Sequence, residues 1–158
     1  MTDSAESVAR AFVEAINRQD VEGLVALMTE GHRFVDSLGN VVEGREKMRA
    51  GWAGYFRMVP DYSIAVEEIL CGSKTRTAGP STASAAADFA QDDSVAENSA
   101  QDVVVLLGVA AGTYAPDGVL KAEKRWETPA ALRASIEDGK VAEWRVYADN
   151  EPIRRLMR

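Results

Sequence analysis

Asp36 is the residue whose surroundings in the sequence point most directly to chemistry. It follows the apolar pair Phe34 and Val35 and precedes a turn that contains Gly39. A carboxylate in an apolar pocket has a raised pKa, because desolvation disfavours the charged form. A carboxylate that titrates near neutral pH can take a proton from a carbon beside a carbonyl. The alternative is that Asp36 accepts hydrogen bonds from backbone amides of the turn, and the sequence leaves both interpretations open.

His32 is the single histidine of the chain and precedes Asp36 by four residues. In a strand, this even spacing places both side chains on one face, so the two are candidates for a catalytic pair at the mouth of a pocket. A partly exposed histidine at the start of the strand is the alternative. We expect no metal site, because one histidine with scattered carboxylates offers too few ligands, and we expect no cofactor.

Aromatic residues are the candidates for the walls of such a pocket. The set consists of Trp52, Tyr55, Tyr62, Trp126 and Trp144. Their indole N–H and phenol O–H groups can supply polar contacts in an otherwise apolar site. Ordinary core packing is the alternative. If the tryptophans filled the pocket, no ligand would enter, and the protein would be an interaction module.

Hydrophobic periodicity and turn residues predict the elements that position these side chains. Helices are expected over 7–18, 21–29 and 43–59, with Asp20 as the cap of the second and a short terminal helix that begins near Pro152. Strands are expected over 32–36, 62–70, 102–114, 119–136 and 141–149. Three helices followed by a curved antiparallel sheet make an α+β fold, here as a single domain over residues 1–158.

Local irregularities in the pattern carry further expectations. The alternation of polar and apolar residues slips at 67–69, as at a β-bulge. The apolar run 103–107 indicates a central strand covered on both faces, and Pro129 must lie at a bulge or an edge of the sheet. Gly51 and Gly54 weaken the third helix, which suggests close packing or room for something beside it.

Composition limits the classes of function. The chain has 158 residues, 46% of them hydrophobic, and a formal net charge of −7. An acidic chain repels phosphate backbones, so no nucleic-acid partner is expected. With no apolar run of membrane-spanning length and no signal-peptide pattern at the start, a cytoplasmic protein is expected. The polar stretch 73–101 is predicted to be a mobile insertion, because it cannot bury enough apolar surface to offset its ordering entropy.

Several segments, taken in order, look like a SnoaL-like protein of the nuclear-transport-factor-2-like superfamily, which also contains ketosteroid isomerase. They are Val8 to Asn17, Asp20, Phe34-Val35-Asp36, Gly44, Asp138-Gly139-Lys140-Val141 and Trp144-Arg145. The resemblance implies a cone in which a curved sheet wraps around the helices and leaves an apolar pocket at its open end. It also implies a homodimer through the outer face of the sheet, where Arg145 and Tyr147 are expected.

The same resemblance implies a role for single residues. Asp36 matches the aspartate that is the general base of ketosteroid isomerase. The two oxyanion donors of that enzyme fall on Phe12 and on or beside Leu132, neither of which donates a hydrogen bond, and loss of one donor costs several kcal/mol of transition-state stabilisation. This argues against ketosteroid isomerisation. Epoxide hydrolysis is disfavoured as well, because the residues it needs fall in the apolar segment 107–111 and on Val146.

The sequence therefore predicts a protein that binds a small apolar molecule in a cone-shaped pocket. Its activity would be an isomerase- or cyclase-type proton transfer by Asp36 with His32, or it would be a non-catalytic binding or dimeric interaction module. The residues expected around the ligand are Phe12, Trp52, Tyr55, Phe56, Trp126, Leu132, Trp144 and Val146.

Overall fold

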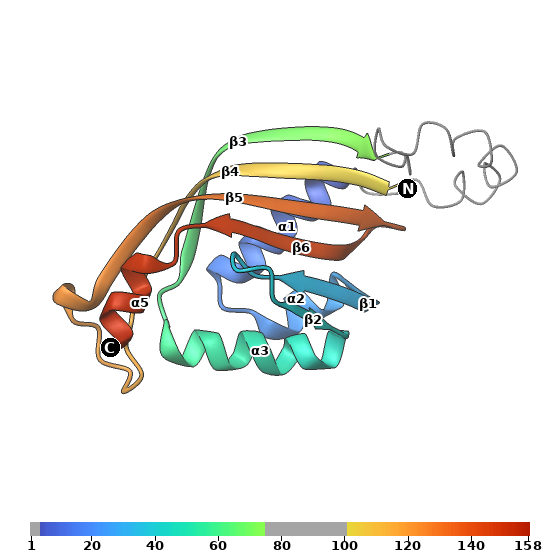
Figure 1. The fold of residues 1–158 in the computed structure, drawn as a ribbon. Helices are drawn as coiled ribbons and strands as arrows, with labels where there is room; N and C mark the ends of the chain where they lie inside the picture. The colour runs from blue at the N-terminus through green and yellow to red at the C-terminus, as the bar shows by residue number, and fades with distance from the viewer. Residues whose placement is uncertain (1–3, 75–100) are drawn as a thin grey trace, which may run out of the picture.

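One curved sheet of six strands forms the frame of the molecule. The computed structural model describes residues 4–74 and 101–158, and the strand order in the sheet is β2-β1-β6-β5-β4-β3. The long strands bend together over the helices (Figure 1). The strands are β1 (Met28–Val35), β2 (Val41–Glu43), β3 (Ser63–Lys74), β4 (Gln101–Thr113), β5 (Arg125–Glu137) and β6 (Lys140–Ala148).

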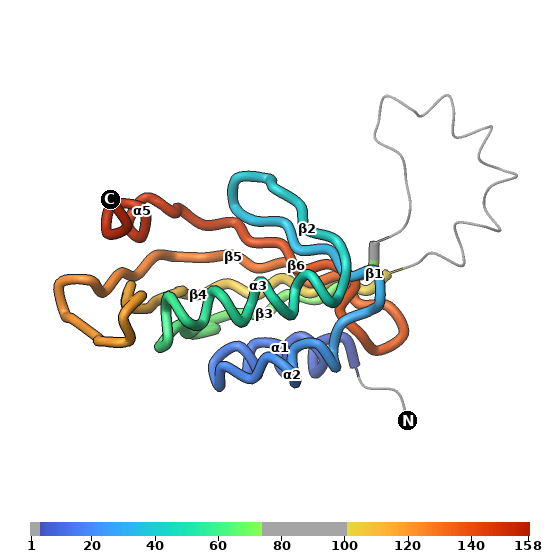
Figure 2. The backbone as a smooth tube through the Cα atoms, turned by 90° about the horizontal axis from the view of Figure 1, so that it is seen from below, coloured from blue at the N-terminus to red at the C-terminus, as the bar shows by residue number. Residues whose placement is uncertain are grey.

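Three helices lie on the concave side of this sheet, and a short one follows the last strand (Figures 1 and 2). Ser4 caps α1 by accepting a hydrogen bond from the Ser7 amide. Asp20 caps α2 through the Gly23 amide, as the sequence predicts. The helices are α1 (Ala5–Asn17), α2 (Val21–Ala26), α3 (Arg45–Met58) and α5 (Glu151–Met157), with a 3-10 turn at η3 (Ala122–Lys124). No described helix is long and apolar enough to cross a membrane.

The core lies between α1 and the concave face of the sheet. Phe12 and Ile16 are completely buried there, and the ring of Phe12 packs at 4.6 Å from that of Trp144 on β6. Leu132 on β5 and Leu106 on β4 complete this contact and are almost fully buried. Because alternate residues of a strand face the same side, every second residue of these strands enters the core. The α+β fold predicted from the sequence is therefore confirmed.

The sheet is mixed, which corrects the expectation of an antiparallel one. β1 runs parallel to β6, while the other neighbouring strands pair antiparallel. The two segments are far apart in the sequence, so no hairpin sets their relative direction. The predicted second helix also ends early. Leu27 closes α2, and Met28 is already in β1, because pairing with β6 outweighs the local helical pattern.

The start of the third helix differs as well. Residues 41–43 form β2, which pairs with β1, and α3 begins only at Arg45. The predicted insertion over 73–101 falls almost entirely outside the described residues. Its first and last residues belong to β3 and β4, which pair as far as Lys74 and Gln101.

Of the three local features of the sheet that the sequence predicts, two are observed. The register of β3 against β4 shifts between Val66 and Glu68, as a bulge requires. Pro129 pairs with Val109 on one side only, since pairing of β5 with β6 begins at Ala130, so it lies at a local edge. The run 103–107 is central but not covered on both faces. Its alternate residues are only half-buried, because α1, α2 and α3 all lie on the same side of the sheet.

Gly108 is required where the bulge meets β4. A methyl group at its Cα would lie 1.9 Å from the carbonyl oxygen of Ala65, and the backbone of β3 cannot move away without disturbing the bulge. This close approach of two strands belongs to the bend of the sheet over the helices (Figure 1).

We expect Gly108→Ala to lower the free energy of unfolding by about 2–4 kcal/mol, because overpacking against backbone forces the strands apart. Urea denaturation followed by circular dichroism measures this change. Gly72→Ala on β3 is the matched control, since nothing lies within 4 Å of a methyl group there, and it should shift the free energy by less than about 0.5 kcal/mol. Equal stability of the two variants would contradict the role of Gly108.

Candidate functional site

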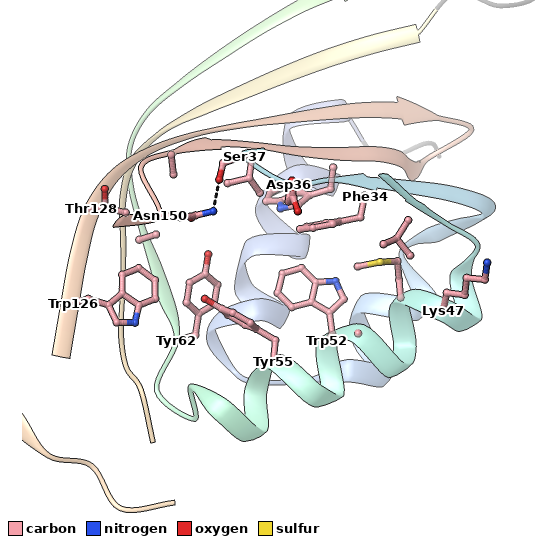
Figure 3. Close-up of a pocket in the computed structure, with 17 residues that line it drawn as sticks. Phe34, Asp36, Ser37, Lys47, Trp52, Tyr55, Tyr62, Trp126, Thr128 and Asn150 are labelled. Carbon is pink, nitrogen blue, oxygen red and sulfur yellow. Dashed lines mark hydrogen bonds between the residues drawn. The ribbon is translucent and has the colours of Figure 1, made fainter. Parts of the chain in front are cut away.

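A cavity of about 390 Å³ lies between α3 and the concave face of the sheet. This volume is in the range of small-molecule sites in proteins. Figure 3 shows its aromatic side chains projecting from α3 and from the strands into one space. Trp52, Trp126 and Trp144 line this space and leave it open. The alternative in which the tryptophans plug the pocket is therefore wrong.

The helix α3 forms one wall through residues that repeat along one face. Met48, Trp52 and Tyr55 are spaced by four and three residues, so they point in the same direction, and all three line the cavity. Gly51 lines it too, which matches the expectation that a glycine leaves room beside this helix. Gly54 is not part of the wall.

The sheet forms the opposite wall. Phe34 on β1 pairs in register with Trp144 on β6, and both side chains line the cavity, as does Val146 two residues further along β6. Phe34 also meets Trp52 across the cavity edge, with ring centroids 6.0 Å apart.

Five of the eight predicted ligand-contact residues line the cavity, and three do not. Trp52, Tyr55, Trp126, Trp144 and Val146 are in its walls. Phe12, Phe56 and Leu132 are buried in the core behind it. They lie behind the walls because they pack between α1, α3 and the sheet, where the layers are in direct contact. They act as support for the walls rather than as contacts to a ligand.

Several residues of the cavity wall carry hydrogen-bond donors without a partner among the described residues. The indole nitrogens of Trp52 and Trp126 are buried and have no hydrogen-bond partner within residues 4–74 and 101–158. The hydroxyl groups of Tyr55 and Tyr62 have none among the described residues either. Burial raises the pKa of Tyr62 to about 12. Burial, together with the nearby Tyr62, raises that of Tyr55 further, so both phenols remain protonated donors at neutral pH.

Asp36 lines the cavity at the end of β1, but its carboxylate is engaged in the turn. Oδ1 accepts hydrogen bonds from the amides of Leu38 and Asn40, both at 2.9 Å, and Oδ2 accepts one from the Asn40 side chain at 3.0 Å. Partial desolvation raises the pKa of Asp36, but these bonds together outweigh it and hold the pKa below its usual value. Of the two interpretations that the sequence left open, the turn contacts are observed, and the pKa of Asp36 is lowered rather than raised, because hydrogen bonds to a carboxylate favour its charged form.

His32 lies in the core rather than at the cavity mouth. Its side chain is completely buried and stacks at 6.0 Å on Phe12. It is not part of the cavity wall, so the pair with Asp36 expected at the mouth of the pocket is not formed. The turn after β1 directs Asp36 to the cavity, whereas the strand directs His32 towards α1.

The hydrogen bond of His32 defines its protonation. Nδ1 lies 2.7 Å from the carbonyl oxygen of Val141. A carbonyl only accepts, so Nδ1 carries the proton. Nε2 is buried without a partner in the described part of the chain, where a second proton would find no acceptor. Burial lowers the pKa of His32 below 6.5, although the bond to Val141 and the charge of Glu143 oppose this shift.

We expect this histidine to make the protein less stable in mild acid. The unfolded chain takes up a proton below the ordinary pKa of about 6.5 while the folded chain does not, so stability is complete above that pH and falls as pH decreases towards the folded pKa, by at most about 1.4 kcal/mol per pH unit. Urea denaturation at several pH values measures this slope. His32→Phe should be less stable near neutral pH, because Val141 loses a partner, and should show a smaller acid slope. An unchanged slope would contradict the assignment.

Other lining residues were not singled out from the sequence. Ser37 and Asn150 are joined by a hydrogen bond of 2.5 Å at the sheet side of the cavity, and Thr128 lies two positions beyond Trp126 on the same face of β5. The alternation of residues along β5 could have predicted Thr128, because it shares a face with Trp126. Nothing in the sequence singles out Asn150 or Lys47, because a cap residue and a helix lysine are common on any surface.

The comparisons with known proteins agree with this architecture. A model of the SnoaL-like domain matches residues 9–144, so the chain belongs to the SnoaL-like family. No curated protein matches the sequence.

Among solved structures, a proposed SnoaL-like polyketide cyclase from Shewanella denitrificans has a TM-score of 0.65 at 12% identity, covering 96% of this chain and 95% of that one. IdmH, a proposed polyketide cyclase from Streptomyces antibioticus, has a TM-score of 0.64 at 17% identity, covering 98% and 99%. A Catenulispora acidiphila protein of ketosteroid isomerase-like fold, in complex with trimethylamine, has a TM-score of 0.61 at 14% identity, covering 91% and 86%. At these identities the likeness establishes the fold alone.

Proposed function

We propose that this protein binds a small, mainly apolar carbonyl compound in the cavity and is an isomerase- or cyclase-type enzyme in which Asp36 transfers a proton. The supporting observation is the cavity itself, whose aromatic walls contain, among the described residues, one carboxylate, that of Asp36. The structural neighbours described as proposed polyketide cyclases are consistent with this reaction class.

The proposed chemistry is a proton transfer at carbon. The Asp36 carboxylate takes a proton from a carbon beside a carbonyl, the electron pair of the C–H bond forms a C=C bond, and the carbonyl π electrons move to its oxygen. Return of the proton to another carbon completes an isomerisation. In a cyclisation, the enolate carbon attacks a second carbonyl and the proton goes to the new alkoxide. A carboxylate of lowered pKa is a weak base, so an acidic C–H between two carbonyls suits it best.

A non-catalytic binding protein is the second candidate. It is favoured by the three hydrogen bonds that Asp36 accepts within its own turn, since a residue so engaged has a sufficient structural role. The two candidates share the ligand site and differ in whether Asp36 reacts.

The variant Asp36→Asn distinguishes the catalytic candidate from the non-catalytic one. The variant keeps an oxygen for the turn amides and loses the basic group. We expect the wild-type protein to accelerate hydrogen–deuterium exchange at the central carbon of benzoylacetone, measured by NMR, and we expect the variant to lose this acceleration by about 100-fold or more. Binding of benzoylacetone, measured by tryptophan fluorescence, should change little.

Asp117→Asn is the matched control, because Asp117 also accepts a turn amide, that of Val119, and does not line the cavity. It should exchange at the wild-type rate. Binding without exchange in the wild-type protein would favour the non-catalytic candidate. Equal exchange rates for the wild-type protein and Asp36→Asn would exclude Asp36 as the base.

We also propose that the protein is a homodimer through the outer face of the sheet. Tyr147 is about half exposed there, and the guanidinium of Arg145 lies 5.6 Å from the centre of its ring. Both residue types are favoured at interfaces. On the same face Arg133 forms an ion pair with Glu143 at 3.3 Å.

Substituting both Arg145 and Tyr147 tests this interface. We expect the wild-type protein to elute as a dimer in size-exclusion chromatography with light scattering, and we expect Arg145→Glu combined with Tyr147→Ser to elute as a monomer, because like charges then meet across the symmetry axis. The control, Arg57→Glu on α3, should leave the dimer intact. A wild-type monomer would contradict the proposal.

A further inference from the structure

Among the polar groups of the cavity wall, some acceptors already have hydrogen-bond partners within the protein, whereas the phenol donors do not. Two of the acceptor groups are used within the protein: Asp36 receives three hydrogen bonds in its turn, and the Ser37 hydroxyl accepts one from Asn150. Tyr55 and Tyr62 line the cavity, and their hydroxyls have no partner among the described residues. A ligand that covers these hydroxyls without offering an acceptor leaves them unsatisfied, which costs about 1–3 kcal/mol for a buried donor.

The two tyrosines form one unit on the wall opposite the sheet. Their rings meet edge to face, with centroids 5.0 Å apart, and Trp126 packs 6.0 Å beyond Tyr62. Figure 3 shows the Tyr62 hydroxyl directed from this wall towards the side where Asn150 and Ser37 lie.

The backbone around Tyr62 holds this hydroxyl in place. The Tyr62 carbonyl accepts a hydrogen bond from the Gln19 side chain at 2.9 Å. The preceding residue, Asp61, accepts two from Thr113 at 2.7 Å each, and the Tyr62 amide donates to Val59 at 3.1 Å. A donor fixed in this way loses little entropy when it bonds to a ligand.

We infer that Tyr55 and Tyr62 form a subsite for a carbonyl oxygen. The ligand is then a flat apolar ketone or quinone-like molecule whose oxygen lies beside these two hydroxyls. The inference rests on the ligand-binding part of the proposed function. Apolar walls of Phe34, Met48 and Trp144 accommodate the carbon skeleton. Because the unpartnered groups are donors, a ligand that brings an acceptor is preferred over one of the same shape that brings none.

The subsite differs from the donors that the family resemblance points to. Those positions are Phe12 and Leu132, both apolar and both outside the cavity wall. Tyr55 comes from α3, and Tyr62 comes from the loop before β3. The burial that raises the pKa of both phenols keeps them protonated, so each acts as a hydrogen-bond donor and not as a source of protons.

A pair of isosteric probes tests the subsite. Methyl naphthyl ketone and isopropenyl naphthalene have the same shape, but a CH2 group replaces the ketone oxygen in the second. We expect the wild-type protein to bind the ketone about 10-fold more tightly, as one or two hydrogen bonds allow. Tyr62→Phe and Tyr55→Phe should each reduce this preference, and the double variant should bind both probes equally, with its affinity for isopropenyl naphthalene unchanged. Titration by tryptophan fluorescence gives the affinities.

Tyr114→Phe is the matched control, because Tyr114 is half-buried and lies outside the cavity wall, and it should keep the wild-type preference. Infrared spectroscopy of the bound ketone in the wild-type protein adds a measurement that needs no variant, since a hydrogen-bonded carbonyl stretches at lower frequency than a free one.

Three results would overturn the inference. Equal wild-type affinity for the two probes, with a carbonyl frequency as in an apolar solvent, would remove the subsite and leave the ligand-binding proposal standing. A ketone preference that survives in the double variant would place the donor elsewhere. Failure of both probes to bind would remove the binding proposal and this inference together.

Discussion

The parallel pairing of β1 with β6 is the contact on which the cavity depends. It joins segments that lie more than a hundred positions apart in the chain and places Phe34 beside Trp144. His32 reinforces the seam through its hydrogen bond to Val141, whose amide in turn donates to Leu27 at 2.7 Å. Without this seam, the turn that carries Asp36 would have no defined position relative to the wall formed by β6.

The cavity also depends on the curvature of the sheet. The bulge between Val66 and Glu68 and the close approach of Gly108 allow the long strands β3 and β4 to bend. A flat sheet would lie at one distance from all helices and would pack tightly against each of them. The bent sheet packs closely on α1 and stands away from α3, so the same layer arrangement produces a dry core at Phe12 and an open cavity at Trp52.

The local structure around each polar group of the cavity determines whether it already has a hydrogen-bond partner within the protein. Asp36 lies in a turn, where neighbouring amides are within reach of its carboxylate, so its hydrogen bonds are formed inside the protein. Tyr55 and Tyr62 project from a helix face and a loop, and their hydroxyls meet no acceptor among the residues that the structure describes. The site therefore has a charged acceptor that is already engaged and neutral donors that are not, which makes the donors the more informative guide to the ligand.

The sequence by itself determined the cap at Asp20, the bulge near Glu67, the α+β class and most of the order of elements, because each of these depends on neighbours within a few positions. Residue type and helical spacing also indicated Trp52, Tyr55 and Trp126 as cavity residues, and the family resemblance indicated the inner face of β6, which carries Trp144 and Val146. Only the tertiary structure decided that β1 runs parallel to β6, that His32 is buried while Asp36 is bonded within its turn, and that Phe12 and Leu132 lie behind the walls. These outcomes depend on how far each helix stands from the sheet and on which distant acceptor a side chain meets, and no local pattern encodes such distances.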